Sequence, residues 1–444
     1  MRKIKKVKKY LNRKIRRKPL KTFQRILEES VKSLGIKISK VYFRNIYILF
    51  LGILISRRSR LINTSEKLYS SNIVGANCAK SLENRLSYFF SKIARKKLKN
   101  INKVYQEQFF YNGLEEIKDS LWRFSGKKIL VVDWTAYSKR ARLNKKGRGM
   151  EHVGKVYDSR EDGVVTGYGG FLGGLLLKDK NIFPLFHELY SNEYSFNEWR
   201  TLNDLEMGKI KGVKEKLGEN ILAMGDAYFF KKAHIYSCYQ NGIDFLFRLK
   251  NDISIIDKGK SISLKEKIKM IKEEHKIVWE YKENNKIKRV SGMAKFFKCI
   301  TIFRSGKLKK FLPINVICVK VSKYKDPMYL ITSLEVTAEN IEEIVELYNK
   351  RWAIEIFIEN LKNNLGLEEF MVRKWDAIEL ICNIILSVYT VSLIILLTSG
   401  SVILNGIINL LRREIIIKKL TLTLSRLMYG FSLILVSQRQ VKYA

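Results

Sequence analysis

Two short apolar runs, each ending in an aspartate, constrain the fold of this chain more than any other feature. Residues 127–133 read KKILVVD and residues 220–226 read NILAMGD. Short runs of this kind predict buried β-strands, and the segment SFNEWRTLNDLEMGKIKGVKEKLG predicts a helix that crosses back to the second strand. An aspartate that ends a strand is often only a turn or cap residue. Because sites on open sheets lie at strand ends, Asp133 and Asp226 are also candidates for a functional site.

A third candidate acid lies on a predicted helix over residues 337–366. Tyr348, Arg351, Glu355 and Lys362 follow one another at spacings of three, four and seven residues. On an α-helix these offsets place the four side chains within an arc of about 60°. One alternative is a solvated amphipathic helix with an i,i+4 ion pair. The two strand-ending aspartates favour a functional interpretation of this polar face.

The charge of the chain points to a polyanionic partner. It has 84 Lys and Arg against 43 Asp and Glu, a formal net charge of +41. Binding of nucleic acid explains such an excess, since many phosphate contacts need many cations. An anionic membrane surface and a lysine-rich background composition are the alternatives. The hydrophobic content of 46% indicates a globular protein.

Several other kinds of site are poorly supported. The five cysteines are scattered without CxxC spacing, and the four histidines show no HxxxH pattern. The sequence therefore argues against a zinc site or a Ser-His-Asp triad and predicts reduced thiols in a cytosolic protein. The glycines of 167–174 lack a following P-loop Lys-Ser/Thr, which favours a hairpin over a phosphate cradle. The apolar run 380–397 predicts a buried core helix, with a transmembrane span as the alternative.

The acids themselves suggest the chemistry. Asp133, Asp226 and Glu355 are three carboxylates without a histidine, a set that suits Mg²⁺ or Mn²⁺ rather than zinc. Two such ions can activate a water or a 3′-hydroxyl and stabilise the leaving oxygen in phosphodiester cleavage. With the strong positive charge, this chemistry indicates nucleic acid as the substrate.

The motifs together resemble a known family. From about residue 120 to 375, the sequence is similar to insertion-sequence transposases of the DDE class, in the branch with the Y-(2)-R-(3)-E-(6)-K signature. Tyr348, Arg351, Glu355 and Lys362 match that signature without a gap, and ILVVDWT and AMGDAYF resemble the two aspartate motifs. IDFLFRLKND and PMYLITSL also resemble family segments. Ala-Tyr-Phe follows the second aspartate, where many relatives carry an arginine.

The resemblance implies a fold, a reaction and roles for the motif residues. The fold would be α/β, with an RNase H-like core interrupted by a β-rich insertion. Asp133, Asp226 and Glu355 would bind two Mg²⁺ or Mn²⁺ ions. The remaining signature residues would contact phosphates of the transposon end, namely Tyr348, Arg351 and Lys362. The reaction would be cut-and-paste transposition by 3′-OH attack, often through a hairpin intermediate, in a homodimeric synaptic complex on DNA.

We expect six regions: a basic arm (1–25), a helical DNA-binding domain (26–120), the first part of the core (121–250), the β-rich insertion (251–327), the second part of the core (328–374) and C-terminal helices (375–444). We further expect a cytoplasmic, nucleoid-associated bacterial protein without a membrane segment. The alternatives are a catalytically inactive, transposase-derived DNA-binding protein or repressor, and a membrane-associated basic protein. Two roles stay open, since Glu359 either joins the site or borders it, and Trp279 either stacks on an unpaired base or packs in a core.

Overall fold

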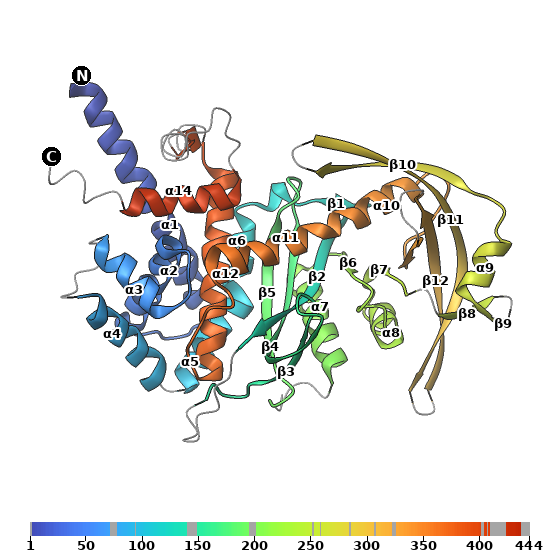
Figure 1. The fold of residues 1–444 in the computed structure, drawn as a ribbon, viewed down its shortest axis with the longest axis horizontal. Coiled ribbons are helices and arrows are strands. Elements are labelled where there is room, and N and C mark those ends of the chain that lie inside the picture. The colour runs from blue at the N-terminus through green and yellow to red at the C-terminus, as the bar shows by residue number, and fades with distance from the viewer. Residues whose placement is uncertain are drawn as a thin grey trace.

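The computed structural model describes residues 2–71, 78–93, 95–139, 149–194, 201–250, 253–257, 259–283, 286–305, 308–321, 326–400, 404–405, 407–408 and 423–436. Figure 1 shows three parts along the longest axis. Helices from the start of the chain lie at one end, a β-sheet lies in the middle, and long β-ribbons lie at the other end.

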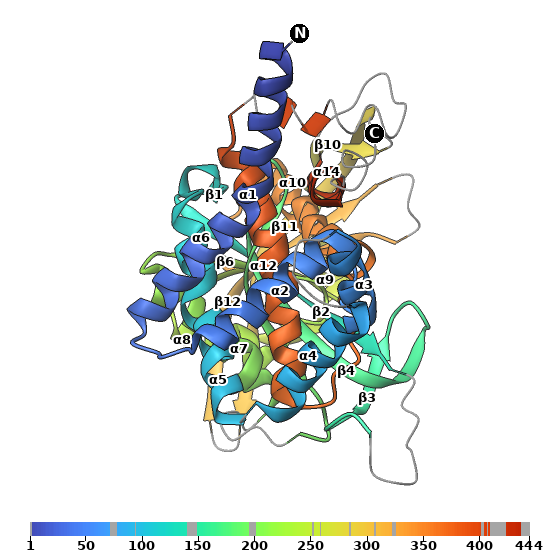
Figure 2. The ribbon, with the colours of Figure 1, turned by 90° about the vertical axis from the view of Figure 1, so that its left-hand side faces the viewer.

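The chain begins with helices. Their bounds are α1 (Arg2–Ser33), α2 (Lys40–Ser56), α3 (Leu61–Ser70), α4 (Ala79–Lys92), α5 (Arg95–Val104), a π-helical turn η1 (Tyr105–Phe109), α6 (Phe110–Glu115) and a 3₁₀ turn η2 (Lys118–Ser120). In α4, Leu82, Leu86 and Phe89 recur at helical spacing and are buried, so one face of the helix packs inward. The helices α1, α2 and α5 all contact a later helix, α12 (Trp375–Thr398), which Figure 2 shows running among them.

The described strands form one mixed sheet of 13 strands. Its first seven strands are β1 (Arg123–Phe124), β2 (Lys127–Ser138), β3 (Gly154–Asp158), β4 (Gly163–Leu176), β5 (Ile182–Tyr190), β6 (Ile221–Gly225) and β7 (Asp244–Arg248). The order across the central part is β4-β2-β6-β7, and β5 pairs with β4. Strand β6 is parallel to both β2 and β7, whereas β4 is antiparallel to β2 and β5. The fold is thus mixed α/β with a large sheet.

Two helices connect these strands. Helix α7 (Leu202–Leu217) begins with a capping box between Thr201 and Asp204 and ends at Gly218, whose φ of 59° is left-handed. It crosses from β5 to β6, and α8 (Lys232–Gln240) crosses from β6 to β7. Helix α8 joins the parallel neighbours β6 and β7, as a crossover helix does. Helix α7 leads from β5, which pairs with β4, to β6, which pairs with β2.

The ribbons come from the segment between β7 and β13 (Met328–Thr332). It contains β8 (Ser254–Asp257), β9 (Lys260–Ser263), α9 (Leu264–Met270), β10 (His275–Glu283), β11 (Lys286–Ser305) and β12 (Leu308–Lys320). Strand β12 pairs with β13, and β13 pairs with β7, so the ribbons extend the same sheet. Trp279 on β10 is 7% exposed and lies against the backbone of Gly292 on β11, which fits the core alternative for this tryptophan.

The helix expected over 337–366 is not one regular α-helix. It consists of α10 (Ile341–Asn349), a 3₁₀ turn η3 (Lys350–Trp352), α11 (Ala353–Glu359) and a π-helical turn η4 (Asn360–Asn364). The 3₁₀ turn is wound more tightly than an α-helix and the π-helical turn more loosely, so the constant angle of 100° per residue does not hold across the segment.

The stretch after β2 contributes one more strand to the sheet, since β3 pairs with β4; residues 140–148 lie outside the described part of the chain. In the described residues, α12 is the one helix long and apolar enough to cross a membrane by length and composition. Yet 89% of its most apolar 18-residue window is buried, as in a core helix. A last helix, α14 (Leu424–Val436), packs on α2 and α12.

Candidate active site

Asp133 lies near the middle of β2, beside strand β6. The pairs Lys128–Ile221 to Val131–Met224 set the parallel register of the two strands. Extending that register by two residues places Asp133 next to Asp226, which directly follows β6. Gly225 precedes this aspartate, and a Cβ on it would lie 2.6 Å from the ring of Phe229. A glycine is therefore needed where the chain folds back over the strand end.

Each aspartate is held by a backbone amide that follows it in sequence. The N–H of Trp134 donates to Oδ1 of Asp133 at 2.8 Å. The N–H of Tyr228 donates to Oδ1 of Asp226 at 2.9 Å. Both aspartates thus have one oxygen engaged by the backbone of their own segment.

Arg351 connects Asp133 with the third acid. Its Nη1 lies 3.5 Å from Oδ2 of Asp133, and its Nη2 pairs with Oε1 of Glu355 on α11. The i,i+4 spacing predicted from the sequence places Arg351 and Glu355 side by side despite the 3₁₀ turn between α10 and α11. The arginine side chain is 13% exposed and that of Glu355 is 33% exposed, so the pair lies at the edge of the buried region.

Asp226 and Glu355 lie close enough to Asp133 for their charges to affect its pKa. Burial raises the pKa of Asp133 to about 7, and the negative charges of Asp226 and Glu355 add to the rise, while Arg351 and the Trp134 amide oppose it. Burial alone would lower the pKa of Arg351, but the charges of Tyr348, Asp133 and Glu355 raise it overall. The raised pKa of Asp133 thus comes first from burial, and the neighbouring acids add to it.

The other two signature residues lie on either side of these acids. Burial raises the pKa of the Tyr348 phenol to about 12, and the Arg351 guanidinium carbon lies 5.9 Å from the centre of its ring. Lys362 in the π-helical turn is only 9% exposed. Its Nζ donates to the carbonyl of Ala136 on β2 at 2.9 Å and pairs with Glu368 at 2.5 Å. Tyr348 thus borders the acids, whereas Lys362 holds β2 three residues beyond Asp133.

Glu359 does not join this group. It is exposed, and the side-chain amide of Asn363 donates to it at 3.3 Å. Among the described residues, no three His, Cys, Asp or Glu side chains lie close enough as placed to hold a metal ion together. Arg351 lies between Asp133 and Glu355 and supplies the positive charge that these two carboxylates contact.

Sequence reasoning missed a buried acid behind the site. Glu206 on α7 is 0% exposed, and its Oε1 accepts a hydrogen bond from Nε1 of Trp134 at 2.7 Å. The sequence did contain an indication that Glu206 is buried. It lies four residues before Ile210 and seven before Val213, which places it on the apolar face of the helix. A charged residue on such a face is rarely buried without a partner.

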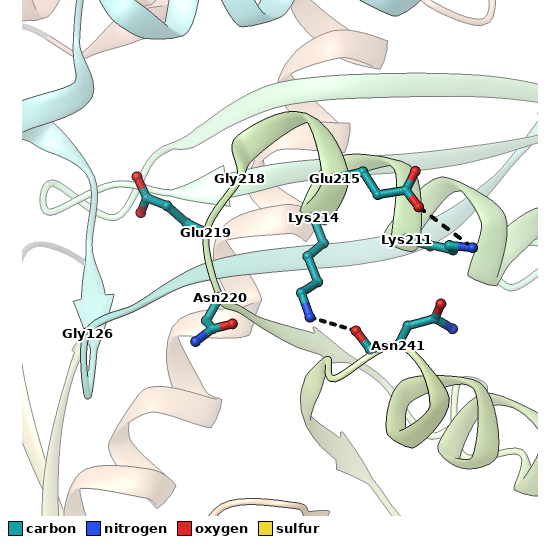
Figure 3. A pocket seen from close by; sticks show the side chains of 8 residues that line it. All are labelled: Gly126, Lys211, Lys214, Glu215, Gly218, Glu219, Asn220 and Asn241. Carbon is teal, nitrogen blue, oxygen red and sulfur yellow. Dashed lines mark hydrogen bonds and ion pairs between the residues drawn. The ribbon is translucent and has the colours of Figure 1, made fainter.

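A separate hollow lies at the opposite ends of the strands. It has a volume of about 480 Å³ and is lined by Gly126 and Asn220, which precede β2 and β6, and by residues of α7. As Figure 3 shows, Lys214 donates to the carbonyl of Asn241, at 2.6 Å, and Lys211 pairs with Glu215 at 3.6 Å. These lysines have partners, and the strand ends with the aspartates are remote from the hollow.

Residues 203–391 match the family model described as the transposase DDE domain. The match supports a DDE transposase family and, in general, a transposase function. Such a family implies DNA as the partner and generally uses divalent metal ions. The matched part includes Asp226 and Glu355 and begins after Asp133; no curated protein matches the chain.

Proposed function

We propose that this protein is a DNA transposase that cleaves the ends of a mobile element and joins the freed 3′-OH to target DNA. The observation that carries the proposal is geometric: the register of β2 and β6 brings Asp133 beside Asp226, and Arg351 contacts both Asp133 and Glu355. Phosphodiester chemistry needs carboxylates that converge from separate elements, and these come from β2, the end of β6 and α11.

The order of the central strands supports an RNase H-like core. Strands β5, β4 and β2 form an antiparallel set, and β2, β6 and β7 form a parallel set on its other side. The two aspartates then lie on the adjacent strands at the centre of this order. The six regions predicted from the sequence, with the ribbons as the β-rich insertion, are part of the same proposal.

The chemistry of the three acids suits divalent cations, because all three offer oxygen ligands. Burial is the main cause of the raised pKa of Asp133, and the negative charges of Asp226 and Glu355 add to it, so a nearby cation would favour the ionised carboxylate. We infer that Asp133, Asp226 and Glu355 hold Mg²⁺ or Mn²⁺, with two ions as the expected number. When bound there, the ions would supply Lewis-acid stabilisation of charge on the phosphate and the leaving oxygen. Asp133 and Glu355, which contact Arg351 here, would contact the cation in its place when one is bound.

The arginine released by that exchange has a role on the DNA. We propose that Arg351 then contacts a phosphate of the transposon end, with Tyr348 beside it, because a guanidinium matches phosphate oxygens in a paired geometry. Lys362 belongs to the same proposed set through the YREK signature. A phosphate there would compete with Glu368 for its ammonium group.

The net charge of the chain and its similarity to transposases suggest which partners it binds. A net charge of +41 supports contact with long stretches of DNA backbone. We propose a homodimer that pairs two transposon ends in a synaptic complex. The YREK branch and the cut-and-paste route are likewise proposals.

A strand-cleavage assay tests the function. The substrate is a duplex that ends in the inverted repeats flanking the gene, and the proteins are wild type, Asp133→Ala, Asp226→Ala and Glu355→Ala. Glu359→Ala is the matched control, because Glu359 lies one turn from Glu355 and is exposed. We expect Mg²⁺-dependent cleavage by wild type and the control, and none by the other three.

Two results would contradict the proposal. Cleavage by Glu355→Ala at the wild-type rate would remove this acid from the catalytic set. A wild-type protein that binds the ends tightly but cuts in neither Mg²⁺ nor Mn²⁺ would instead identify the inactive, repressor-like alternative.

A further inference from the structure

Glu206 is a fully buried acid, and it lies on the face of the sheet opposite to the face that Arg351 contacts. Side chains alternate along a strand, so Asp133 and Trp134 of β2 point to opposite faces. Asp133 faces Arg351, whereas Trp134 faces Glu206 on α7. The Glu206 carboxylate therefore lies on the opposite side of the sheet from the Asp133 carboxylate, behind the candidate active site.

The first link from Glu206 leads to Asp133. Oε1 of Glu206 accepts from the indole N–H of Trp134 at 2.7 Å. Trp134 also donates its backbone N–H to Oδ1 of Asp133 at 2.8 Å. The indole also stacks on Phe171 with ring centres 5.1 Å apart, so packing and the hydrogen bond together fix one rotamer of Trp134.

The second link leads to Asp226. Lys231 donates to Oε2 of Glu206 at 3.0 Å, and its Nζ lies 3.8 Å from the centre of the Tyr228 ring. Burial raises the pKa of the Tyr228 phenol, and the charge of Glu206 and a hydrogen bond to it raise it further. The backbone N–H of Tyr228 is the donor to Oδ1 of Asp226 at 2.9 Å.

A third contact ties the turn after Asp226 to the next helix. Nε2 of His234 on α8 lies 2.7 Å from Oε2 of Glu206, and its Nδ1 lies 3.1 Å from the carbonyl of Phe229. Burial alone would raise the pKa of Glu206, but His234 and Lys231 lower it overall, so the side chain is held as a carboxylate. The segments that follow Asp133 and Asp226 thus each contribute side chains that contact the Glu206 carboxylate.

We propose that Glu206 is a positioning residue that sets the spacing of Asp133 and Asp226 for cation binding. One carboxylate holds both residues whose backbone amides engage Oδ1 of the two aspartates, so it fixes where the two carboxylates lie relative to each other. The proposal rests on the proposed function, since it assigns the cation to those aspartates. Packing alone does not explain an acid here, because an apolar side chain would fill the same space without the cost of burying a charge.

Direct metal binding by full-length protein tests this role without any need for DNA. The variant is Glu206→Gln, which keeps the size of the side chain but presents an amide to Lys231 and His234. Glu215→Gln is the matched control, because Glu215 lies on the same helix with a side chain that is 64% exposed. Free Mn²⁺ is measured by electron paramagnetic resonance, and the melting temperature is recorded for each protein.

We expect Glu206→Gln to raise the dissociation constant for Mn²⁺ about 10-fold, as loss of a group that orients metal ligands generally does. The control retains the wild-type value. Saturating Mn²⁺ is expected to bring the cleavage rate of Glu206→Gln back toward that of wild type, which a general loss of folded structure would not allow.

A second variant and a reference keep the outcome decisive. Trp134→Phe removes the indole N–H donor, keeps an aromatic ring beside Phe171, and leaves the pairs of Glu206 with Lys231 and His234. If Glu206→Gln does not fold, the Mn²⁺ affinity of Trp134→Phe decides the outcome. Wild-type Mn²⁺ affinity in both variants overturns the positioning role. Asp133→Ala is the reference for the proposed function: if it abolishes Mn²⁺ binding while Glu206→Gln does not alter it, only the positioning role fails.

Discussion

Replacing Asp133 with asparagine should stabilise the metal-free protein, and should do so more at pH 8 than at pH 5. The pKa of Asp133 rises from 3.8 to about 7 through burial and through the charges of Asp226 and Glu355. The folded state then binds a proton that the unfolded state has lost, so wild-type stability falls as pH rises from about 4 to about 7. Asparagine has no such proton, and its advantage grows over this window.

The magnitude follows from the two pKa values. At 1.36 kcal/mol per pKa unit, the advantage of Asp133→Asn is about 2 kcal/mol at pH 5 and about 4 kcal/mol at pH 8. The attraction to Arg351 is already contained in the pKa of Asp133. With an unfolding entropy of about 2.1 cal/mol/K per residue over 444 residues, the difference between the two pH values is about 3 °C in melting temperature.

Thermal unfolding in EDTA at pH 5, 6, 7 and 8 measures the effect. Asp326→Asn is the control, because Asp326 is exposed and should show no pH-dependent gain. An equal gain for Asp133→Asn at pH 5 and pH 8, or no gain at pH 8, would refute the assignment of a raised pKa to this carboxylate. It would also weaken the inference that the three acids share one site.

Three further predictions concern metal, packing and backbone. At pH 8, millimolar Mn²⁺ should raise the melting temperature of wild type but not of Asp133→Asn, and a matching rise in the variant would place the ion elsewhere. Phe357→Ala should cost about 3–5 kcal/mol in unfolding free energy, since the ring is fully buried against Tyr389 with centres 4.8 Å apart; a chemical denaturation shift below 1 kcal/mol would contradict that packing. Gly366→Ala should lower the melting temperature more than Gly35→Ala: both residues have positive φ, but only at Gly366 would a Cβ meet other atoms, the nearest at 2.9 Å. Equal losses would mean that backbone strain, not the close approach, dominates.

Local pattern predicted the elements that carry the acids. The apolar runs before Asp133 and Asp226 form β2 and β6 because short apolar segments bounded by polar residues are buried as strands. The spacing of Arg351 and Glu355 predicted their contact, since residues four apart on a helix face the same way. These features depend on nearest neighbours along the chain and are therefore readable from it.

Element boundaries near the site were less predictable. Helix α8 does not follow Asp226 directly but begins at Lys232, because the Tyr228 amide turns back to Asp226 and Phe229 covers Gly225. The helix around Glu355 is interrupted by a 3₁₀ turn before that residue and by a π-helical turn after it. In the π-helical turn, Lys362 donates to the carbonyl of Ala136 and pairs with Glu368. In each case, a contact with a distant residue or a strand end outweighs the local helical preference.

The sequence by itself determined the charge, the two apolar runs that lead to Asp133 and Asp226, and the i,i+4 spacing of Arg351 and Glu355, because these are properties of composition and local periodicity. It predicted Asp133 at the end of its strand, whereas β2 continues to Ser138. Only the tertiary structure decided that β2 and β6 pair in a register that brings the aspartates together. It alone placed Arg351 between Asp133 and Glu355, and Glu206 behind Trp134. The burial that shifts the pKa of Asp133 comes from elements far apart in the chain, and no local pattern records which of them will meet.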